Sequence, residues 1–279
     1  MGAGGVPGAL PSGSAMHYRF HASTDPGRVR SNNEDAVLFD ESVGLAVLAD
    51  GMGGYNAGEV ASGIVVAYLQ EHFAAWLATD GADASARSLW RAMRQHVSAA
   101  NATIMAVAEQ QPECHGMGTT LVFGIFQPQR VSIGSIGDSR CYRLRGGRLE
   151  QISHDHSVLQ EQIDAGEVDP AQARVAPNRN LVTRALGFPV SGDLDVFELE
   201  PQPGDLYLLC SDGLTDMLED DRIAELLRTR SSLETCASAL IRAANAAGGR
   251  DNVSVLLVMS DGEPVTRRPG FLRWRRGPG

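Results

Sequence analysis

The chain contains no lysine, so all 24 of its basic residues are arginines. With 34 acidic residues the net charge is −10, which argues against nucleic acid as the main partner, because a polyanion would be repelled. Long apolar runs are also missing. The longest, such as residues 43–49 and 253–259, have the length of a strand, whereas a membrane span needs about 20 apolar residues. We therefore expect no membrane-spanning segment.

The cysteines lack the paired spacing of a zinc site. Cys114, Cys141, Cys210 and Cys236 form no CxxC pair, and the chain has no HExxH motif. Residues 1–16 are rich in Gly, Pro and Ser and hold no continuous apolar stretch, so we expect a flexible extension there and not a signal peptide. Free thiols without an export signal predict a reducing compartment, the cytoplasm.

Length and composition predict a single domain. A chain of 279 residues that is 43% hydrophobic can bury a sizeable core, and we expect one domain at residues 17–262, active as a monomer. Residues 263–279 concentrate five arginines with Phe271 and Trp274. We interpret this segment as a solvated tail; the alternative is a docking peptide for an acidic protein or an anionic membrane surface.

Aspartates in short glycine- or asparagine-marked contexts are spread along the whole chain: Asp35 in RSNNEDA, Asp50 in VLADGMGG, Asp138 in GSIGDSR, Asp212 in LLCSDGLTD and Asp251 in GRDNVSV. Three of them follow an apolar run, where a strand end gives a carboxylate a rigid mount. Gathered carboxylates repel one another unless a cation neutralises them, and all-oxygen ligands suit Mg²⁺ or Mn²⁺. The alternative, ordinary turn residues, explains one or two of these aspartates but not five.

Hydrophobic patterns predict the secondary structure. We expect strands at 18–23, 36–40, 43–49, 119–126, 130–136, 140–144, 148–152, 193–199, 205–210 and 253–259. We expect helices at 57–77, 89–107, 158–164, 221–229 and 233–247, and a polar region at 166–179. The pair Gly146-Gly147 predicts a hairpin turn. Strands joined by hairpins and helices in pairs predict antiparallel sheets with the helices outside.

Eight strings occur in the order typical of one family: ASTDPGRVRSNNEDA (22–36), LADGMGG (48–54), GMGTT (116–120), GDSR (137–140), ISHDHSVL (152–159), NLVTRALG (180–187), CSDGLTD (210–216) and DNVSVLLV (251–258). Over roughly residues 17–260 the chain resembles the bacterial metal-dependent phosphoserine/phosphothreonine phosphatases of the PPM, or type 2C, family. The resemblance implies an α+β fold, a four-layer α-β-β-α sandwich of two antiparallel sheets flanked by helices.

The resemblance also implies a role for each site residue. Asp50 would be the ligand shared by two Mn²⁺ or Mg²⁺ ions and, with Arg30, would form the catalytic centre. The remaining implied ligands are Asp212 and Asp251 for the first ion, Glu34, Asp35 and the Gly51 carbonyl for the second, and Asp138 with Asp212 for a third, weaker one. Arg30 would bind the substrate phosphate through its fork of donors. Asn252 would orient the neighbouring Asp251.

One position departs from the eukaryotic pattern, in which a histidine follows the metal-binding Asp-Gly pair as the proposed general acid. This chain has Met52 there. His154 and His156 are candidates for the acid by residue type alone, and we expect them to have a structural or capping role near the helix at 158–164. Residues 160–185 correspond to the family's flap beside the active site, where the substrate-selecting surface is expected.

The expected partners are phosphoproteins and a cognate Ser/Thr kinase, whose action the enzyme would reverse. Two alternatives stay open. One is a catalytically inactive relative that serves as a binding module; that class loses metal-binding aspartates, which this chain keeps. The other is a phosphatase of an anti-sigma-factor antagonist, an enzyme that usually carries sensor domains for which this chain has no room.

Overall fold

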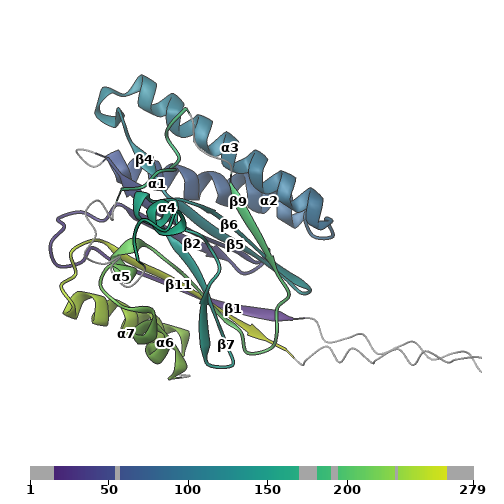
Figure 1. Ribbon diagram of the computed structural model, residues 1–279. Helices are drawn as coiled ribbons and strands as arrows, with labels where there is room; N and C mark the ends of the chain where they lie inside the picture. The colour runs from purple at the N-terminus through teal and green to yellow at the C-terminus, as the bar shows by residue number, and fades with distance from the viewer. Residues whose placement is uncertain (1–15, 54–56, 170–180, 190–193, 230–231, 263–279) are drawn as a thin grey trace, which may run out of the picture.

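The structure is a computed structural model that describes residues 16–53, 57–169, 181–189, 194–229 and 232–262. The described chain folds into four layers, helices on sheet on sheet on helices (Figure 1). This is the α-β-β-α sandwich that the resemblance implied. Apart from Met16, the expected extension at 1–16 lies outside the described residues, and so does the tail at 263–279.

One sheet has the strand order β1-β11-β10-β7-β8, and every pairing in it is antiparallel. Its strands are β1 (His17–Asp25), β7 (Arg140–Arg145), β8 (Arg148–Gln151), β10 (Leu206–Cys210) and β11 (Val253–Asp261). The predicted hairpin between β7 and β8 is confirmed. Gly146 and Gly147 have φ of +57° and +82° there, values that glycine adopts at little cost.

The second sheet has the order β2-β3-β5-β6-β9 and is also antiparallel. Its strands are β2 (Asp35–Asp40), β3 (Leu45–Met52), β5 (Leu121–Gln127), β6 (Arg130–Ile136) and β9 (Asp195–Leu199), and the short β4 (Gly118–Thr119) pairs with the end of β3. The prediction ended the third strand at residue 49, whereas β3 continues to Met52, because Asp50 pairs with Asp35 on β2 and the next two residues pair with β4.

Helices cover the outer face of each sheet (Figure 1). On the second sheet lie α1 (Ala57–Tyr68), a π-helical turn (Leu69–Phe73), α2 (Ala74–Ala78) and α3 (Ala86–Gln110), and a 3₁₀ turn (Pro112–Cys114) follows. On the first lie α6 (Asp220–Arg228) and α7 (Leu233–Ala246), while α4 (Val158–Asp164) and α5 (Asp212–Thr215) are short. The helix predicted at 57–77 is present but contains the π turn, and α5 was not predicted. No helix in the described part of the chain combines the length and apolar composition of a membrane span.

Apolar side chains fill the space between each pair of layers. One cluster joins the second sheet to α1, α2 and α3, with Leu89, Met93 and Phe123 at its centre. Another joins the first sheet to α6 and α7. A third lies between the two sheets and is formed by Phe20, Leu48, Val122, Phe126, Val131, Ile133, Tyr207, Leu209, Leu256 and Val258, among others. Burial of these residues fixes the two sheets face to face.

The strand registers bring distant parts of the chain to one rim of the sandwich. Asp35 begins β2 opposite Asp50 near the end of β3. On the other sheet, Cys210 ends β10 and pairs with Arg140 at the start of β7, and β11 begins beside the same end. In Figure 1 this rim lies on the left, beside the labels α4 and α5. Because both sheets are antiparallel, strand ends and strand starts alternate along the rim.

Phe126 tests the importance of the packing between the sheets. It is 4% exposed, and its ring lies 5.3–5.6 Å from the rings of Tyr18, Phe20 and Tyr207. Phe126→Ala should lower the free energy of unfolding by about 3–5 kcal/mol, measured by denaturant titration. Phe39→Ala is the matched control, since Phe39 is 38% exposed and stacks only on Phe20 among the aromatic rings described. An equal loss in the two variants would contradict this account.

Candidate active site

Acidic side chains from both sheets gather at this rim. Asp35 and Asp50 face each other on β2 and β3, and Asp138 lies in the turn from β6 to β7. Asp212 is the first residue of α5, directly after β10, and Asp251 precedes β11 by two residues. The five predicted aspartates therefore occupy strand ends or adjacent turns. Each is half-buried, so it lies among protein atoms and keeps part of its surface open to solvent.

The electrostatics show that these carboxylates act on one another. Burial raises the pKa of Asp50 well above its ordinary value, and the negative charges of Asp35, Asp212, Asp138 and Asp251 raise it further. Burial also raises the pKa of Asp212, with the charges of Asp138 and Asp251 next in importance. Such mutual repulsion requires carboxylates close together, and a divalent cation is the usual means of relieving it.

Asp35 has one oxygen satisfied by the protein and one that is not. Ser211 Oγ donates to Asp35 Oδ2 at 2.8 Å. Oδ1 is buried and has no hydrogen-bond partner among the residues that the structure describes. Burial raises the pKa of this carboxyl to about 6. A buried carboxylate oxygen without a donor is costly, so this atom is well suited to face a cation, directly or through water.

Glu34 and Gly51 lie side by side where β3 meets the start of α1. Gly51 N donates to the Glu34 carbonyl at 3.1 Å. A Cβ atom at position 51 would lie 2.2 Å from the Gly58 carbonyl oxygen and 2.6 Å from that of Glu34, so only glycine fits. A Cβ at Gly58 would in turn lie 2.9 Å from the Glu34 carboxylate. Burial, with the charges of Asp251 and Glu59, raises the pKa of Glu34, while Arg30 lowers it.

Asn252 joins the Asp251 turn to the loop that carries Glu34. Its backbone N donates to Asp251 Oδ1 at 2.9 Å, and its side-chain Oδ1 accepts from Glu34 N at 2.8 Å. Its Nδ2 donates to the carbonyls of Pro26 (3.0 Å) and Asn32 (2.8 Å). These bonds connect the loop that carries Glu34 to the turn that carries Asp251.

Arg30 lies at the solvent side of the acidic cluster. Its Nη2 donates to Asp251 Oδ2 at 2.7 Å, and its side chain is 52% exposed. The charges of Glu34 and Asp212 also act on the guanidinium. A half-exposed guanidinium keeps donors beyond the one that bonds Asp251, and these can receive an anion from solvent.

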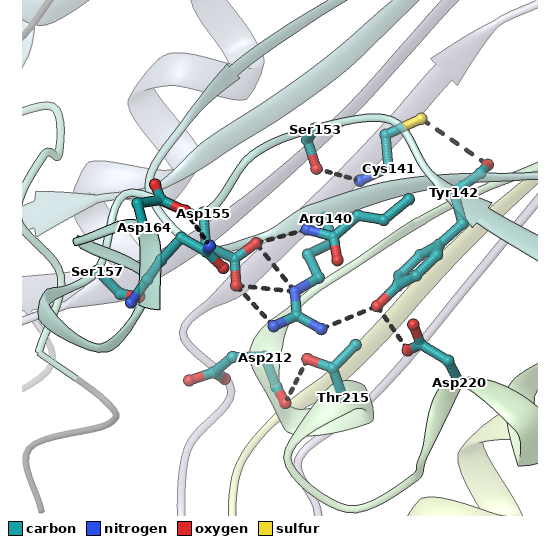
Figure 2. Close-up of polar contacts among 12 residues, drawn as sticks. Arg140, Cys141, Tyr142, Ser153, Asp155, Ser157, Asp164, Asp212, Thr215 and Asp220 are labelled. Atoms are coloured by element: carbon teal, nitrogen blue, oxygen red, sulfur yellow. Dashed lines mark hydrogen bonds and ion pairs between the residues drawn. The ribbon is translucent and has the colours of Figure 1, made fainter. Parts of the chain in front are cut away.

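Asp138 is held in a tight turn. Gly137 before it has φ of +102°, in the left-handed region that favours glycine. Burial raises the pKa of the Asp138 carboxyl to about 6; the charge of Asp155 raises it further, whereas that of Arg140 lowers it. Figure 2 shows Arg140 between Asp155 on one side and Asp212 at the start of α5 on the other.

The donor set fits a hard divalent cation. The candidate ligands are carboxylates and a backbone carbonyl, with no thiol or imidazole among them. In the part of the chain that the structure describes, no three acidic, histidine or cysteine side chains converge closely enough to hold an ion by themselves. Mg²⁺ and Mn²⁺ do not need such a cage, since Mg²⁺ in particular keeps several waters and takes one or two carboxylates.

Sequence reasoning missed two hydroxyl groups that support the aspartates. Thr120 Oγ1 accepts from Asp50 N at 3.1 Å and is bonded to Ser139 Oγ at 2.8 Å. Ser211, besides its bond to Asp35, accepts from Ser254 N at 3.0 Å. Both residues lie in strings that carried the resemblance, GMGTT and CSDGLTD, but no local pattern indicates which aspartate a hydroxyl will meet.

The two candidate histidines differ in environment. His154 is exposed, and its Nε2 lies 3.1 Å from Asp164 on α4. His156 is 5% exposed; its Nδ1 accepts from Gly137 N at 3.1 Å, and its Nε2 lies 3.1 Å from Asp195 Oδ2. Burial lowers the pKa of His156. Both ring nitrogens of His156 are engaged by the protein, which agrees with a structural role. Part of the predicted flap, residues 170–180, lies outside the described residues.

Comparison with known proteins identifies the family. Residues 27–247 match the family model described as protein phosphatase 2C. The serine/threonine phosphatase stp of Listeria monocytogenes is 38% identical over 249 residues, which are 88% of this chain and 96% of the relative. The serine/threonine protein phosphatase PstP of Mycobacterium tuberculosis is 43% identical over 242 residues, 86% of this chain and 44% of the relative.

Solved structures of serine/threonine phosphatases have the same fold as this chain. The crystal structure of the Mycobacterium tuberculosis phosphatase PstP/Ppp superposes with a TM-score of 0.80 at 40% identity, covering 88% of this chain and 99% of that chain. The catalytic domain of PstP in complex with two manganese ions superposes with a TM-score of 0.78 at 38% identity, with the same coverage. Sequence, fold and the acidic rim lead to one conclusion: the chain belongs to the protein phosphatase 2C family.

Proposed function

We propose that the protein is a metal-dependent serine/threonine phosphatase with a dinuclear centre at the acidic rim, and that it hydrolyses phosphoserine and phosphothreonine in proteins. The observation that carries the proposal is the gathering of five aspartates from two sheets, whose burial and mutual repulsion raise the pKa values of Asp50 and Asp212. Relatives named as serine/threonine phosphatases support the substrate class. The relative solved with two manganese ions supports the cofactor.

The residues that would hold the ions are the predicted ones. Asp50 is the proposed shared ligand. The others are Asp212 and Asp251 for the first ion, Glu34, Asp35 and the Gly51 carbonyl for the second, and Asp138 with Asp212 for a third, weaker one. When bound, two such cations, Mn²⁺ or Mg²⁺, lower the pKa of a water molecule and neutralise charge on the phosphoryl oxygens.

The chain's own residues bind and orient the substrate. Arg30 would receive phosphoryl oxygens in its fork of donors and so orient the phosphate group. Asn252 keeps Asp251 and the loop carrying Arg30 in fixed relation, since it bonds to both segments. Ser211 fixes the orientation of Asp35, and Thr120 fixes the end of β3 at Asp50.

The proposed catalytic domain is residues 17–262, and the proposed biological role is to reverse a Ser/Thr kinase of the same cytoplasm, as a monomer acting on phosphoproteins. An inactive binding module is not favoured, because the chain keeps every aspartate of the predicted set. A phosphatase of an anti-sigma-factor antagonist has no observation here in its favour.

Removal and return of the cation tests the proposal directly. EDTA should stop phosphate release from a phosphothreonine peptide, because the carboxylates alone cannot activate water. Mn²⁺ or Mg²⁺ should restore the activity, and Zn²⁺ should restore little of it, since zinc prefers nitrogen and sulfur ligands. Phosphate release is measured colorimetrically. Turnover that persists after thorough chelation would remove the dinuclear centre from consideration.

Asp212→Asn should lower kcat by more than about 100-fold, because it removes the negative charge of a direct ligand of the first ion. Loss of a residue that only orients a ligand typically costs about 10- to 100-fold, and loss of the ligand itself should cost more. In EDTA its unfolding temperature should stay equal or rise, since repulsion among the carboxylates is relieved. Asp221→Asn is the matched control: this exposed aspartate in the first turn of α6 should leave both quantities unchanged. Full turnover of Asp212→Asn in saturating Mn²⁺ would show that the ligand assignment is wrong.

Arg30→Ala should raise KM for a phosphopeptide more than it lowers kcat, because the guanidinium already contacts the phosphate in the ground state. Arg30→Lys should recover part of the loss, as an ammonium lacks the bidentate geometry. Arg28→Ala removes the same charge from the same loop and, being exposed, should leave KM within about threefold. Steady-state kinetics check this, and an unchanged KM in Arg30→Ala would place Arg30 outside the phosphate site.

A further inference from the structure

We propose that Asp155 and His156 are positioning residues that clamp the turn carrying Asp138 and so fix the direction of its carboxylate. The inference rests on the proposed function, which makes Asp138 a ligand, and goes beyond it by assigning a task to the HDHS segment. The segment follows β8 and lies against the turn from β6 to β7. Two neighbours of Asp138 are held, Gly137 on one side and Arg140 on the other.

The first arm of the clamp is an ion pair between Asp155 and Arg140. Arg140 Nε lies 2.9 Å from both carboxylate oxygens of Asp155, and Nη2 lies 2.6 Å from Oδ2. The Asp155 side chain is only 8% exposed and the Arg140 side chain 27%. Figure 2 shows the carboxylate and guanidinium face to face, with Nη1 of Arg140 turned to the Tyr142 hydroxyl at 2.9 Å.

Further hydrogen bonds hold the groups on both sides of this ion pair, so the guanidinium has little freedom to move. Gln151 Nε2 donates to Asp155 Oδ1 at 2.8 Å, and the Tyr142 hydroxyl donates to Asp220 Oδ1 at 3.0 Å. Arg140 begins β7 and is separated from Asp138 by one residue, Ser139, whose hydroxyl is bonded to Thr120. The backbone on the C-terminal side of Asp138 is therefore fixed by a bidentate pair and a hydroxyl bond.

The second arm is the ring and backbone of His156. Gly137 N donates to His156 Nδ1 at 3.1 Å, and His156 N donates to the Gly137 carbonyl at 2.9 Å. Because Nδ1 accepts, the ring proton sits on Nε2, where Asp195 Oδ2 lies at 3.1 Å. A Cβ at Gly137 would lie 2.7 Å from Thr120, so the turn runs in a narrow slot. The backbone on the N-terminal side of Asp138 is thus held at both its polar groups.

The same histidine also holds the segment that returns from the flap. Thr183 N donates to the His156 carbonyl at 2.8 Å, and Val158 N donates to the Leu181 carbonyl at 2.9 Å. Arg184 Nη1 lies 3.3 Å from His156 Nε2. His156 therefore connects the Asp138 turn with the described end of the flap, which it bonds through its backbone carbonyl. Its two ring nitrogens have separate partners, Gly137 for Nδ1 and Asp195 for Nε2.

That separation allows a matched pair of variants. His156→Asn places an amide oxygen near the Nδ1 position, so it keeps an acceptor for Gly137 N and loses the contacts of Nε2. His156→Gln places its amide near the Nε2 position, so it keeps a partner for Asp195 and leaves Gly137 N without an acceptor. Arg140→Lys tests the other arm, because an ammonium keeps the charge but not the bidentate geometry.

The readout is Mn²⁺ binding, followed by the electron paramagnetic resonance of free Mn²⁺, with unfolding temperature recorded for every variant. Asp138→Ala defines which ion is lost when this carboxylate is removed. His156→Gln and Arg140→Lys should lower the affinity for that same ion by about 10- to 100-fold, as expected for groups that orient a ligand. The affinities for the other ions should not change. His156→Asn should stay within about threefold of the unmodified protein.

A purely structural role predicts a different pattern. If His156→Gln and Arg140→Lys lower the unfolding temperature but bind Mn²⁺ as the unmodified protein does, the clamp does not position Asp138. If Asp138→Ala itself binds Mn²⁺ normally, the positioned residue holds no ion, and the inference is overturned while phosphatase activity can still stand. If the binding pattern appears as expected but the unmodified protein hydrolyses no phosphopeptide, the inference holds and the proposed function fails.

Discussion

Repulsion among carboxylates at the rim is the constraint that the rest of the structure has to satisfy. Burial already disfavours the charge of Asp50 and Asp212, and their neighbours disfavour it further. A flexible chain would relieve this repulsion by moving the side chains apart. Here they cannot separate, because they sit at the ends of strands whose opposite faces are buried between layers, and the packing of Phe126 and its neighbours between the sheets supplies that rigidity.

Hydrogen bonds between the two sheets fix the positions of the rim residues more closely than the apolar packing alone. Asn252 bonds Glu34 and Asn32 of one segment while it belongs to the turn before β11. Ser211, at the end of the first sheet, bonds Asp35 on the second. Each of these bonds links residues more than 170 positions apart, so the rim is assembled only when both sheets have formed. The acidic rim is therefore expected to form late, as a consequence of the tertiary structure.

Much of this was predictable from the sequence, for a physical reason. Strand ends, glycine turns and an apolar face leave local patterns, and the family strings placed the aspartates in order. The predictions that failed concern element boundaries, which depend on contacts with residues distant in the sequence. The third strand ends later than predicted because Asp50 pairs with Asp35 and the two residues after it pair with β4. Position 213 requires glycine because a Cβ there would lie 2.0 Å from the Asn252 carbonyl oxygen. The support given by Thr120 and Ser211 is equally non-local.

His156 shows why residue type alone does not assign a catalytic role. A histidine acts as a general acid when one ring nitrogen can reach the leaving group and exchange its proton. In this ring Nδ1 is an acceptor for Gly137, Nε2 faces Asp195 and Arg184, and burial lowers the pKa, so the neutral tautomer is held in one orientation. These contacts engage both ring nitrogens with protein groups. They also make it a rigid joint between the flap and Asp138, because breaking either contact would leave a buried polar group unpaired.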